Sequence, residues 1–364
     1  MNRRHFLQSA TGAALAQSLP LRAAEAHSSG TEGWRTFETV TRVEVKDAFG
    51  LARAWVPLPL EADTDWHKTI GNSWSGNATQ AEIRHDGKYG LGLLYAEWPA
   101  REANPVIEVT SRFMTRDRAV DFSRPDSSLD LSAADRKFFT APTELIPTDG
   151  IVRKTALEVT KGAKTDVEKS RAIYEWIVDN TFRDPKTRGC GVGDVKSLLE
   201  SGNLGGKCAD LNALYVGLAR AVDVPARDVY GLRVASSKYG YKSLGTGSPN
   251  VTKAQHCRAE FFARGFGWVP VDPADVRKVV LEEPPGNLAV RDDKVVAARK
   301  RLFGSWEMNW LAYNMGHDVK LPNATKAPKL AYLMYTNAES DGELRDQLEP
   351  DSVKYTITAR EIGV

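Results

Sequence analysis

The chain has 364 residues, which is enough for two domains of ordinary size, and its 42% hydrophobic and 26% charged residues are typical of a soluble globular protein. The formal net charge is +2, and residues 1–26 hold three basic residues and one acidic residue, so the remainder is formally neutral. A neutral chain without a basic stripe gives no reason to expect a nucleic acid or an anionic membrane as a partner.

The first 26 residues are typical of an export signal. Arg3 and Arg4 precede a moderately apolar run, and Ala24-Glu25-Ala26 fits the small-x-small pattern at which such signals are cleaved. The paired arginines resemble a twin-arginine leader, and an ordinary secretory leader is the alternative. Either leader predicts a periplasmic or otherwise exported protein. No later stretch has the roughly 18 uninterrupted apolar residues of a spanning helix, so we expect no membrane span.

Residues 34–122 are predicted to form a β-sandwich-like N-terminal domain. Apolar and polar side chains alternate over 40–45 and 106–110, and turn-forming residues separate these short runs. His67 and His85 are isolated among polar neighbours, so we expect both at the surface. Nothing in this region predicts a catalytic site.

The rest of the chain divides into three parts. Residues 123–150 contain three prolines and are predicted to be a linker that wraps rather than folds alone. A helical period follows in the catalytic domain, which we place at 151–283, and Asp166 suits a helix start near Thr165. Residues 284–364 are expected to be a C-terminal extension that packs on the catalytic domain.

The most informative segment is the glycine-rich turn that leads into Cys208. An apolar stripe at helical spacing follows, so Cys208 is predicted at a helix N-terminus. Unpaired backbone N–H groups and the positive end of the helix dipole stabilise a thiolate there and can hold a developing oxyanion. Gly206 and Lys207 are therefore candidates for the oxyanion site or the cleft. A buried structural cysteine is the alternative.

A cysteine nucleophile needs a base. Of the six histidines, two precede residue 34 and two lie in the β domain, which leaves His256 and His317. His256 opens a strand-like run, and a turn at 264–267 folds the chain back into a run that ends at Asp272. In such a hairpin the start of one strand lies beside the end of the next. His256 and Asp272 are therefore predicted neighbours, as an imidazole held by a carboxylate requires.

These motifs together resemble the transglutaminase-like superfamily. The resemblance covers residues 145–280 and rests on the following segments: Gly206-Lys207-Cys208 with its helix, the helix end at Val224-Pro225, the strand with His256 and Glu260, and Gly267-Trp268-Val269-Pro270-Val271-Asp272-Pro273. It implies an α+β fold with a papain-like core, in which helices pack against an antiparallel sheet. It also implies a Cys-His-Asp triad made of Cys208, His256 and Asp272, with Trp268 as a further cleft candidate.

The resemblance implies acyl transfer from a peptide or carboxamide bond through a thioester, without a cofactor. We expect hydrolysis, by a peptidase or amidase, rather than cross-linking, and an exported location makes cell-wall peptides or other peptides the candidate substrates. Two alternatives remain open. The chain could be a non-catalytic module that binds a peptide or polysaccharide in the same cleft, or a structural exported protein whose cysteines form disulfides.

Other patterns carry less weight. The run into Cys208 mimics a phosphate loop, but Ser201 takes the place of its first glycine and Cys208 that of its Ser/Thr, so we reject that function. Neither HExxH nor CxxC occurs, so no metal site is expected. Cys190 and Cys257 are the remaining cysteines, and they either form a disulfide that pins the loop around Cys190 or stay unpaired.

Two further features bear on the substrate. The family usually has an aromatic residue two positions after the histidine, where this chain has Arg258, and we expect that change to alter substrate preference. The segment 304–318 is dense in aromatic residues. It either packs against the core or forms a substrate wall, in which case Asn309 or His317-Asp318 would reach the ligand.

Overall fold

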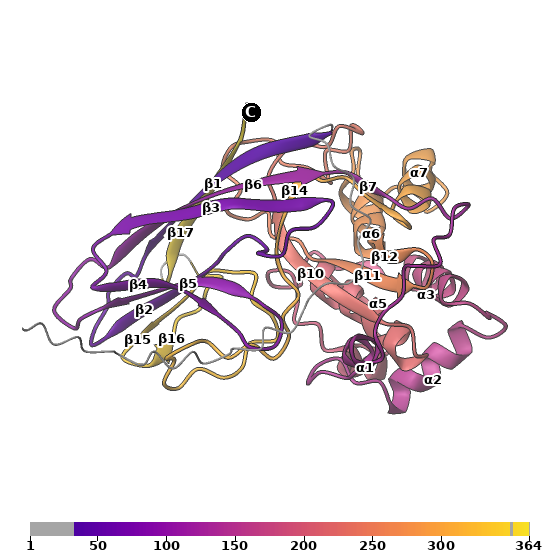
Figure 1. Cartoon of the computed structure of the whole chain (residues 1–364), viewed down its shortest axis with the longest axis horizontal. Coiled ribbons are helices and arrows are strands. Elements are labelled where there is room, and N and C mark those ends of the chain that lie inside the picture. The colour runs from indigo at the N-terminus through magenta and orange to yellow at the C-terminus, as the bar shows by residue number, and fades with distance from the viewer. Residues whose placement is uncertain (1–32, 350–351, 364) are drawn as a thin grey trace, which may run out of the picture.

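The computed structural model describes residues 33–349 and 352–363, so the leader predicted at 1–26 lies outside the described residues. Two lobes lie side by side: a β sandwich, and a sheet covered by helices that contains the predicted catalytic domain and is called the catalytic lobe (Figure 1). The fold is α+β, as predicted. No helix in the described ranges is long and apolar enough to cross a membrane.

The sandwich contains two antiparallel sheets, with strand orders β17-β1-β6-β3 and β16-β15-β2-β5-β4. The strands are β1 Trp34–Glu44, β2 Ala52–Pro57, β3 His67–Gly76, β4 Gln80–His85, β5 Gly92–Trp98, β6 Val106–Arg116, β15 Asn337–Ser340, β16 Glu343–Leu344 and β17 Lys354–Ile362. The alternations at 40–45 and 106–110 fall in β1 and β6, which confirms the predicted strands. Along β6 every second side chain is buried, with Ile107 and Val109 between the sheets and Phe113 where the sandwich meets the second lobe.

One expectation for this lobe is wrong. His67 is fully buried rather than exposed, because β3 starts where the sandwich meets the second lobe. Its ring stacks on Phe113 with centroids 5.8 Å apart, and Trp66 covers it from the side. His85 is exposed and pairs with Glu61 at 2.9 Å. Neither histidine reaches the predicted nucleophile.

Residues 284–364, which are predicted to pack on the catalytic lobe, also form part of the sandwich. Strand β17 pairs with β1 over nine residues, and β15 pairs with β2, so the last strands complete both sheets of the sandwich. The earlier part of the extension joins the catalytic lobe through α7 (Asp293–Arg301) and β14 (Trp310–Asn314). The sequence did not indicate this pairing, because strands so distant in sequence leave no local pattern.

The catalytic lobe is built on an antiparallel sheet of order β12-β11-β10-β14. Its other elements are β7 Arg118–Ala119, α1 Ala133–Thr140, α2 Gly150–Val159, α3 Asp166–Asn180, β8 Phe182–Arg183, α4 Val195–Ser201, β9 Gly205–Gly206, α5 Cys208–Ala221, β10 Ala226–Arg233, β11 Arg258–Ala263, β12 Gly267–Val271, α6 Pro273–Glu282 and β13 Ser305–Trp306. Helix α5 packs against β10, β11 and helices α2, α3 and α6. All its residues except Asp210 are buried, as in a core helix.

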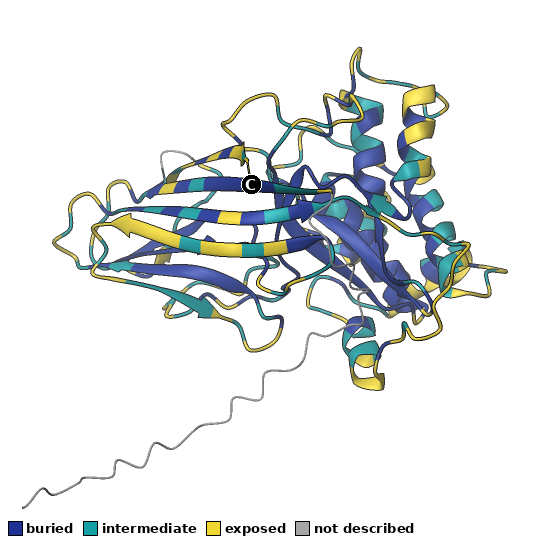
Figure 2. Cartoon of the chain, turned by 45° about the horizontal axis from the view of Figure 1, so that its top comes forward, coloured by how far each residue is buried: buried dark blue, intermediate teal, exposed yellow. Residues whose placement is uncertain are grey.

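Local sequence explains the helix starts in this lobe. Thr165 and Glu168 form a capping box at the start of α3, as predicted. The expected linker 123–150 wraps around the lobe but also contains α1, where the Ser132 side chain caps the first turn. In Figure 2 buried dark blue is concentrated in the catalytic sheet and where the lobes meet, whereas exposed yellow marks the outer ends of the sandwich and the outward faces of helices.

Candidate active site

Cys208 is the first residue of α5, and Asp210 fixes the loop in front of it. The Asp210 carboxylate accepts hydrogen bonds from the backbone N–H groups of Lys207, Val192 and Gly193, each at 3.0 Å. A Cβ atom on Gly206 would meet the Asp210 Cβ at 2.5 Å, so only glycine leaves room for this carboxylate. The glycines before Cys208 therefore allow one half-buried acid to hold the loop and the helix start together.

His256 and Asp272 lie at the open end of the β11–β12 hairpin, as predicted. The Nε2 atom of His256 is 2.7 Å from Oδ2 of Asp272, and both side chains are buried. Asp272 also caps α6, since its Oδ1 accepts from the Asp275 backbone N–H at 3.0 Å. The amide of Asn212 on α5 approaches the same oxygen at 3.4 Å. The carboxylate is thus fixed by the helix that begins at it and by the helix that carries Cys208.

A second carboxylate, which the sequence analysis missed, faces the same imidazole. Asp275 Oδ1 lies 3.3 Å from His256 Nε2 and 2.5 Å from a guanidinium nitrogen of Arg233. Burial and the Arg233 charge act to lower the pKa of His256, but Asp275 and Asp272 raise it to about 9. His256 is therefore an imidazolium at neutral pH. The Asp-x-x-Asp spacing at a helix start was the available sequence signal.

The Cys208 thiol has a pKa well below its ordinary value. Hydrogen bonds from Cys190 and Cys257 favour the thiolate, burial opposes it, and a hydrogen bond from His256 favours it again. Because the Nε2 atom of His256 faces the two carboxylates, Nδ1 is the ring nitrogen left for the sulfur. The structure therefore brings Cys208, His256 and Asp272 together, and the electrostatics favour a thiolate–imidazolium pair.

All three cysteines are buried free thiols, so the structure does not contain the disulfide considered between Cys190 and Cys257. The two thiols instead lie beside Cys208, and the pKa of each is raised. The main cause is the hydrogen bond to Cys208 for Cys190, and burial for Cys257. The Cys190 sulfur also lies 3.4 Å from the carbonyl oxygen of Gln255, which is an alternative acceptor for its single proton. Each sulfur thus has a polar partner without a bridge.

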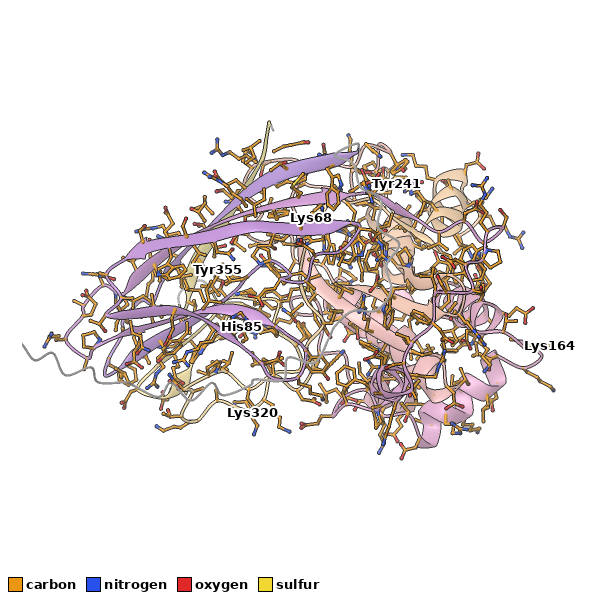
Figure 3. All side chains as sticks on the ribbon, viewed as in Figure 1. Lys68, His85, Lys164, Tyr241, Lys320 and Tyr355 are labelled. Atoms are coloured by element: carbon orange, nitrogen blue, oxygen red, sulfur yellow. The ribbon has the colours of Figure 1, made fainter. Side chains whose placement is uncertain are left out.

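Cys208 and His256 open onto a cavity of about 630 Å³. The catalytic lobe supplies one wall, and Tyr335, Val353 and Tyr355 of the C-terminal segment supply the other. Tyr355 lies on β17 in the sandwich half of the molecule (Figure 3). The site is therefore closed by both lobes, which the expected domain division did not suggest.

The three predicted cleft residues lie in different places. Lys207 lines the cavity, while Gly206 is buried behind it against Asp210. Trp268 packs against Phe139 with ring centroids 4.7 Å apart and does not line this cavity. It lies at the turn end of the hairpin, about 13 Å along the strand from the end that carries Asp272.

Arg258 and the aromatic segment also lie outside the cavity wall. Arg258 is buried, its Nε 3.7 Å from Asp272 and its guanidinium over the Trp310 ring at 4.8 Å, so it supports the Asp272 charge rather than contacting a substrate. The segment packs in the core, with β14 paired to β10. The Asn309 amide donates to backbone carbonyls, and His317 lies against Asp228.

His256, Asp272 and Asp275 offer ligand atoms that all lie within 4.8 Å of one another, the arrangement of a small metal site. Their atoms are already engaged by hydrogen bonds, and Arg233 and Arg258 supply positive charge beside both carboxylates. A divalent cation would add two more positive charges there. The surroundings thus favour a charged imidazole over a metal ion.

Comparisons with known proteins agree with this fold. The transglutaminase-like superfamily profile matches residues 153–273. An uncharacterised protein of Haemophilus influenzae is 34% identical over 339 residues, spanning 89% of this chain and 90% of its own. A crystal structure provisionally named as a cysteine protease, from Cytophaga hutchinsonii, covers 91% of this chain and 92% of its own with a TM-score of 0.56 and 13% identity, which shows a shared fold. The chain belongs to the transglutaminase-like superfamily.

Proposed function

We propose that this protein is an exported cysteine enzyme that cleaves peptide or carboxamide bonds through a thioester, with Cys208 as nucleophile, His256 as acid and base, and Asp272 as the group that orients His256. The observation that carries the proposal is the 2.7 Å contact between His256 and Asp272 beside a thiol whose pKa is lowered. Export rests on the leader pattern of residues 1–26.

In the first step the Cys208 thiolate attacks the scissile carbonyl carbon, and the carbonyl oxygen becomes an oxyanion. The backbone N–H of Cys208 is the first of α5 and has no acceptor within the helix, so it is free to hold this oxyanion. The next N–H, that of Ala209, already donates to the Cys190 carbonyl at 2.9 Å. His256 then gives its proton to the leaving amine, the C–N bond breaks and a thioester remains.

In the second step a water molecule attacks the thioester carbonyl and gives a proton to His256. The C–S bond breaks, the acid leaves and the thiolate–imidazolium pair is restored. An amine in place of water would give cross-linking by the same steps. We propose hydrolysis, with peptides, including cell-wall peptides, as the substrates that an exported enzyme of this kind would meet.

The test is incubation of the purified protein with a peptide library under reducing conditions, followed by mass spectrometry. We expect cleavage by the wild-type protein and none by Cys208→Ala or by the near-isosteric Cys208→Ser. Circular dichroism and thermal unfolding would check that both variants fold. If all three proteins leave the library untouched while binding a peptide or polysaccharide, the non-catalytic binding module replaces the proposed enzyme.

A further inference from the structure

The cavity beside Cys208 has a one-sided charge. Within the described part of the chain, no aspartate or glutamate lines it, whereas seven lysine and arginine residues do. The chain outside the leader is formally neutral, so this excess is local rather than a property of the whole surface. A cavity with one sign of charge and low-dielectric walls concentrates ligands of the opposite sign.

Three of the seven cations have acidic partners behind the wall. Arg233 pairs with Asp275 at 2.5 Å, Arg188 pairs with Asp346 at 2.7 Å and with Glu349 at 2.9 Å, and Lys354 pairs with Glu44 at 3.2 Å. These carboxylates stabilise the cations in the absence of a ligand. None of them lines the cavity.

The remaining four cations are under-compensated. Arg183 and Lys278 share the single carboxylate of Glu282, and no carboxylate of the described residues lies within ion-pair distance of Lys207 or Lys253. Burial lowers the pKa of Lys278, and the nearby charge of Arg233 lowers it further. A negatively charged ligand would relieve this mutual repulsion.

The uncompensated charge is close to the reacting sulfur. Lys207 directly precedes Cys208, and Lys253 lies three residues before His256 on the loop that leads into β11. Lys278 belongs to α6, the helix that Asp272 caps. Positive charge is therefore supplied by the nucleophile loop, by the histidine loop and by the helix behind the aspartate.

We propose that the substrate is an acidic peptide, held with a carboxylate close to the scissile carbonyl by Lys207, Lys253 and the Arg183–Lys278 pair. This inference rests on the proposed function and names its substrate class. A cavity of about 630 Å³ is of the size that encloses a short segment of a peptide. The carboxylate belongs to an aspartate or glutamate side chain or to a free C-terminus, and the two sources are separated below.

The first experiment measures the cavity charge without requiring turnover. Cys208 is alkylated with iodoacetate, which is anionic, and with iodoacetamide, which is neutral, and mass spectrometry gives both rates. The ratio of the two rates cancels any change in the thiolate fraction. We expect the iodoacetate-to-iodoacetamide ratio to fall about fivefold or more in Lys207→Gln/Lys253→Gln, and added salt to lower it in the wild type.

Lys164→Gln is the matched control. Lys164 is exposed and lies at the far end of the catalytic lobe from the sandwich (Figure 3). Its ratio should equal that of the wild type. An unchanged ratio in the double variant would overturn the proposal, whatever the enzyme does to peptides.

The second experiment compares matched peptides: one pair with an internal glutamate or glutamine and blocked ends, and one pair with a free or amidated C-terminus. We expect kcat/KM to be at least tenfold higher for the acidic member of one pair, which identifies the source of the carboxylate, and the preference to shrink in Lys207→Gln/Lys253→Gln. Equal cleavage within both pairs contradicts the acidic substrate. If no peptide is cleaved, the result contradicts the proposed peptide-cleaving function. The alkylation ratio then still decides whether the cavity selects anions.

Discussion

Two buried histidine–aspartate pairs lie at the catalytic sheet, and their surroundings are opposite. His256 is 2.7 Å from Asp272, and His317 is 3.4 Å from Asp228. At the first pair the two acids raise the pKa of the histidine to about 9. At the second, burial lowers the pKa of His317 far below its ordinary value and raises that of Asp228 to about 7.

The difference shows what makes such a pair chemically active. Burial alone drives both members towards their neutral forms, so it leaves His317 uncharged and raises the pKa of Asp228 to about 7. His256 stays charged because Asp275 adds a second carboxylate, which Arg233 holds ionised: burial would raise the pKa of Asp275, but Arg233 keeps it well below its ordinary value. Of these four residues, His256 alone lines the cavity beside Cys208.

Replacing each histidine gives the largest expected contrast. His256→Gln removes the acid and base of the proposed reaction, and losses of about 10⁶-fold in kcat are typical of such changes. His317→Gln should leave kcat/KM within about threefold, although it lowers the free energy of unfolding by about 1–2 kcal/mol through lost packing. Peptide hydrolysis and urea unfolding of both variants would measure this. Equal loss of activity in the two would remove the distinction between the pairs.

Replacing the two aspartates should give the same order of effects on activity as replacing the two histidines. Asp272→Asn keeps the shape of the side chain but removes the charge that orients His256, and the expected loss is up to about 10⁴-fold in kcat. Asp228→Asn, whose partner is already neutral, should change kcat by less than about threefold. Steady-state kinetics at pH 7 would compare them. An active Asp272→Asn enzyme would show that Asp272 only caps α6.

A smaller effect is expected in stability. A histidine whose folded-state pKa is raised to about 9 stabilises the fold fully below its unfolded pKa of about 6.5, and this contribution is lost as pH rises through 9. In a Cys208→Ala background, which removes the thiolate, the free energy of unfolding should fall by at most about 3 kcal/mol between pH 6 and 9.5. Adding Asp275→Asn should shrink that fall, as urea unfolding at both values would show. If the free energy of unfolding falls equally in Cys208→Ala and in Cys208→Ala/Asp275→Asn, Asp275 does not raise the pKa of His256.

Sequence patterns were enough to predict the α+β fold, the strand alternation of β1 and β6 and the hairpin that joins His256 to Asp272. These features depend on local spacing or on a short turn, which a single sequence displays. The position of Cys208 at a helix start followed from its glycine turn and apolar stripe in the same way. The catalytic roles of these residues stay a prediction.

The features that the sequence did not predict are those formed by segments distant in the chain. Arg233 comes to Asp275 from β10, and Tyr355 reaches the cavity from the last strand, because strand pairing across the chain brings them there. His67 has polar neighbours in sequence but aromatic neighbours in space. Asp210 had a local signal, an acid in the first turn of α5, but the loop that it holds is set by tertiary contacts.

The thiolate–imidazolium pair of Cys208 and His256 is tested most directly by the rate at which iodoacetamide alkylates Cys208 between pH 5 and 10. Mass spectrometry of the intact protein follows this rate. A thiolate held by an imidazolium should react at a rate that has already reached its plateau below pH 7, and Asp272→Asn should move the rise towards higher pH. A rate in the wild type that rises only above about pH 8, as for an ordinary thiol of pKa about 8.5, would contradict the thiolate–imidazolium pair.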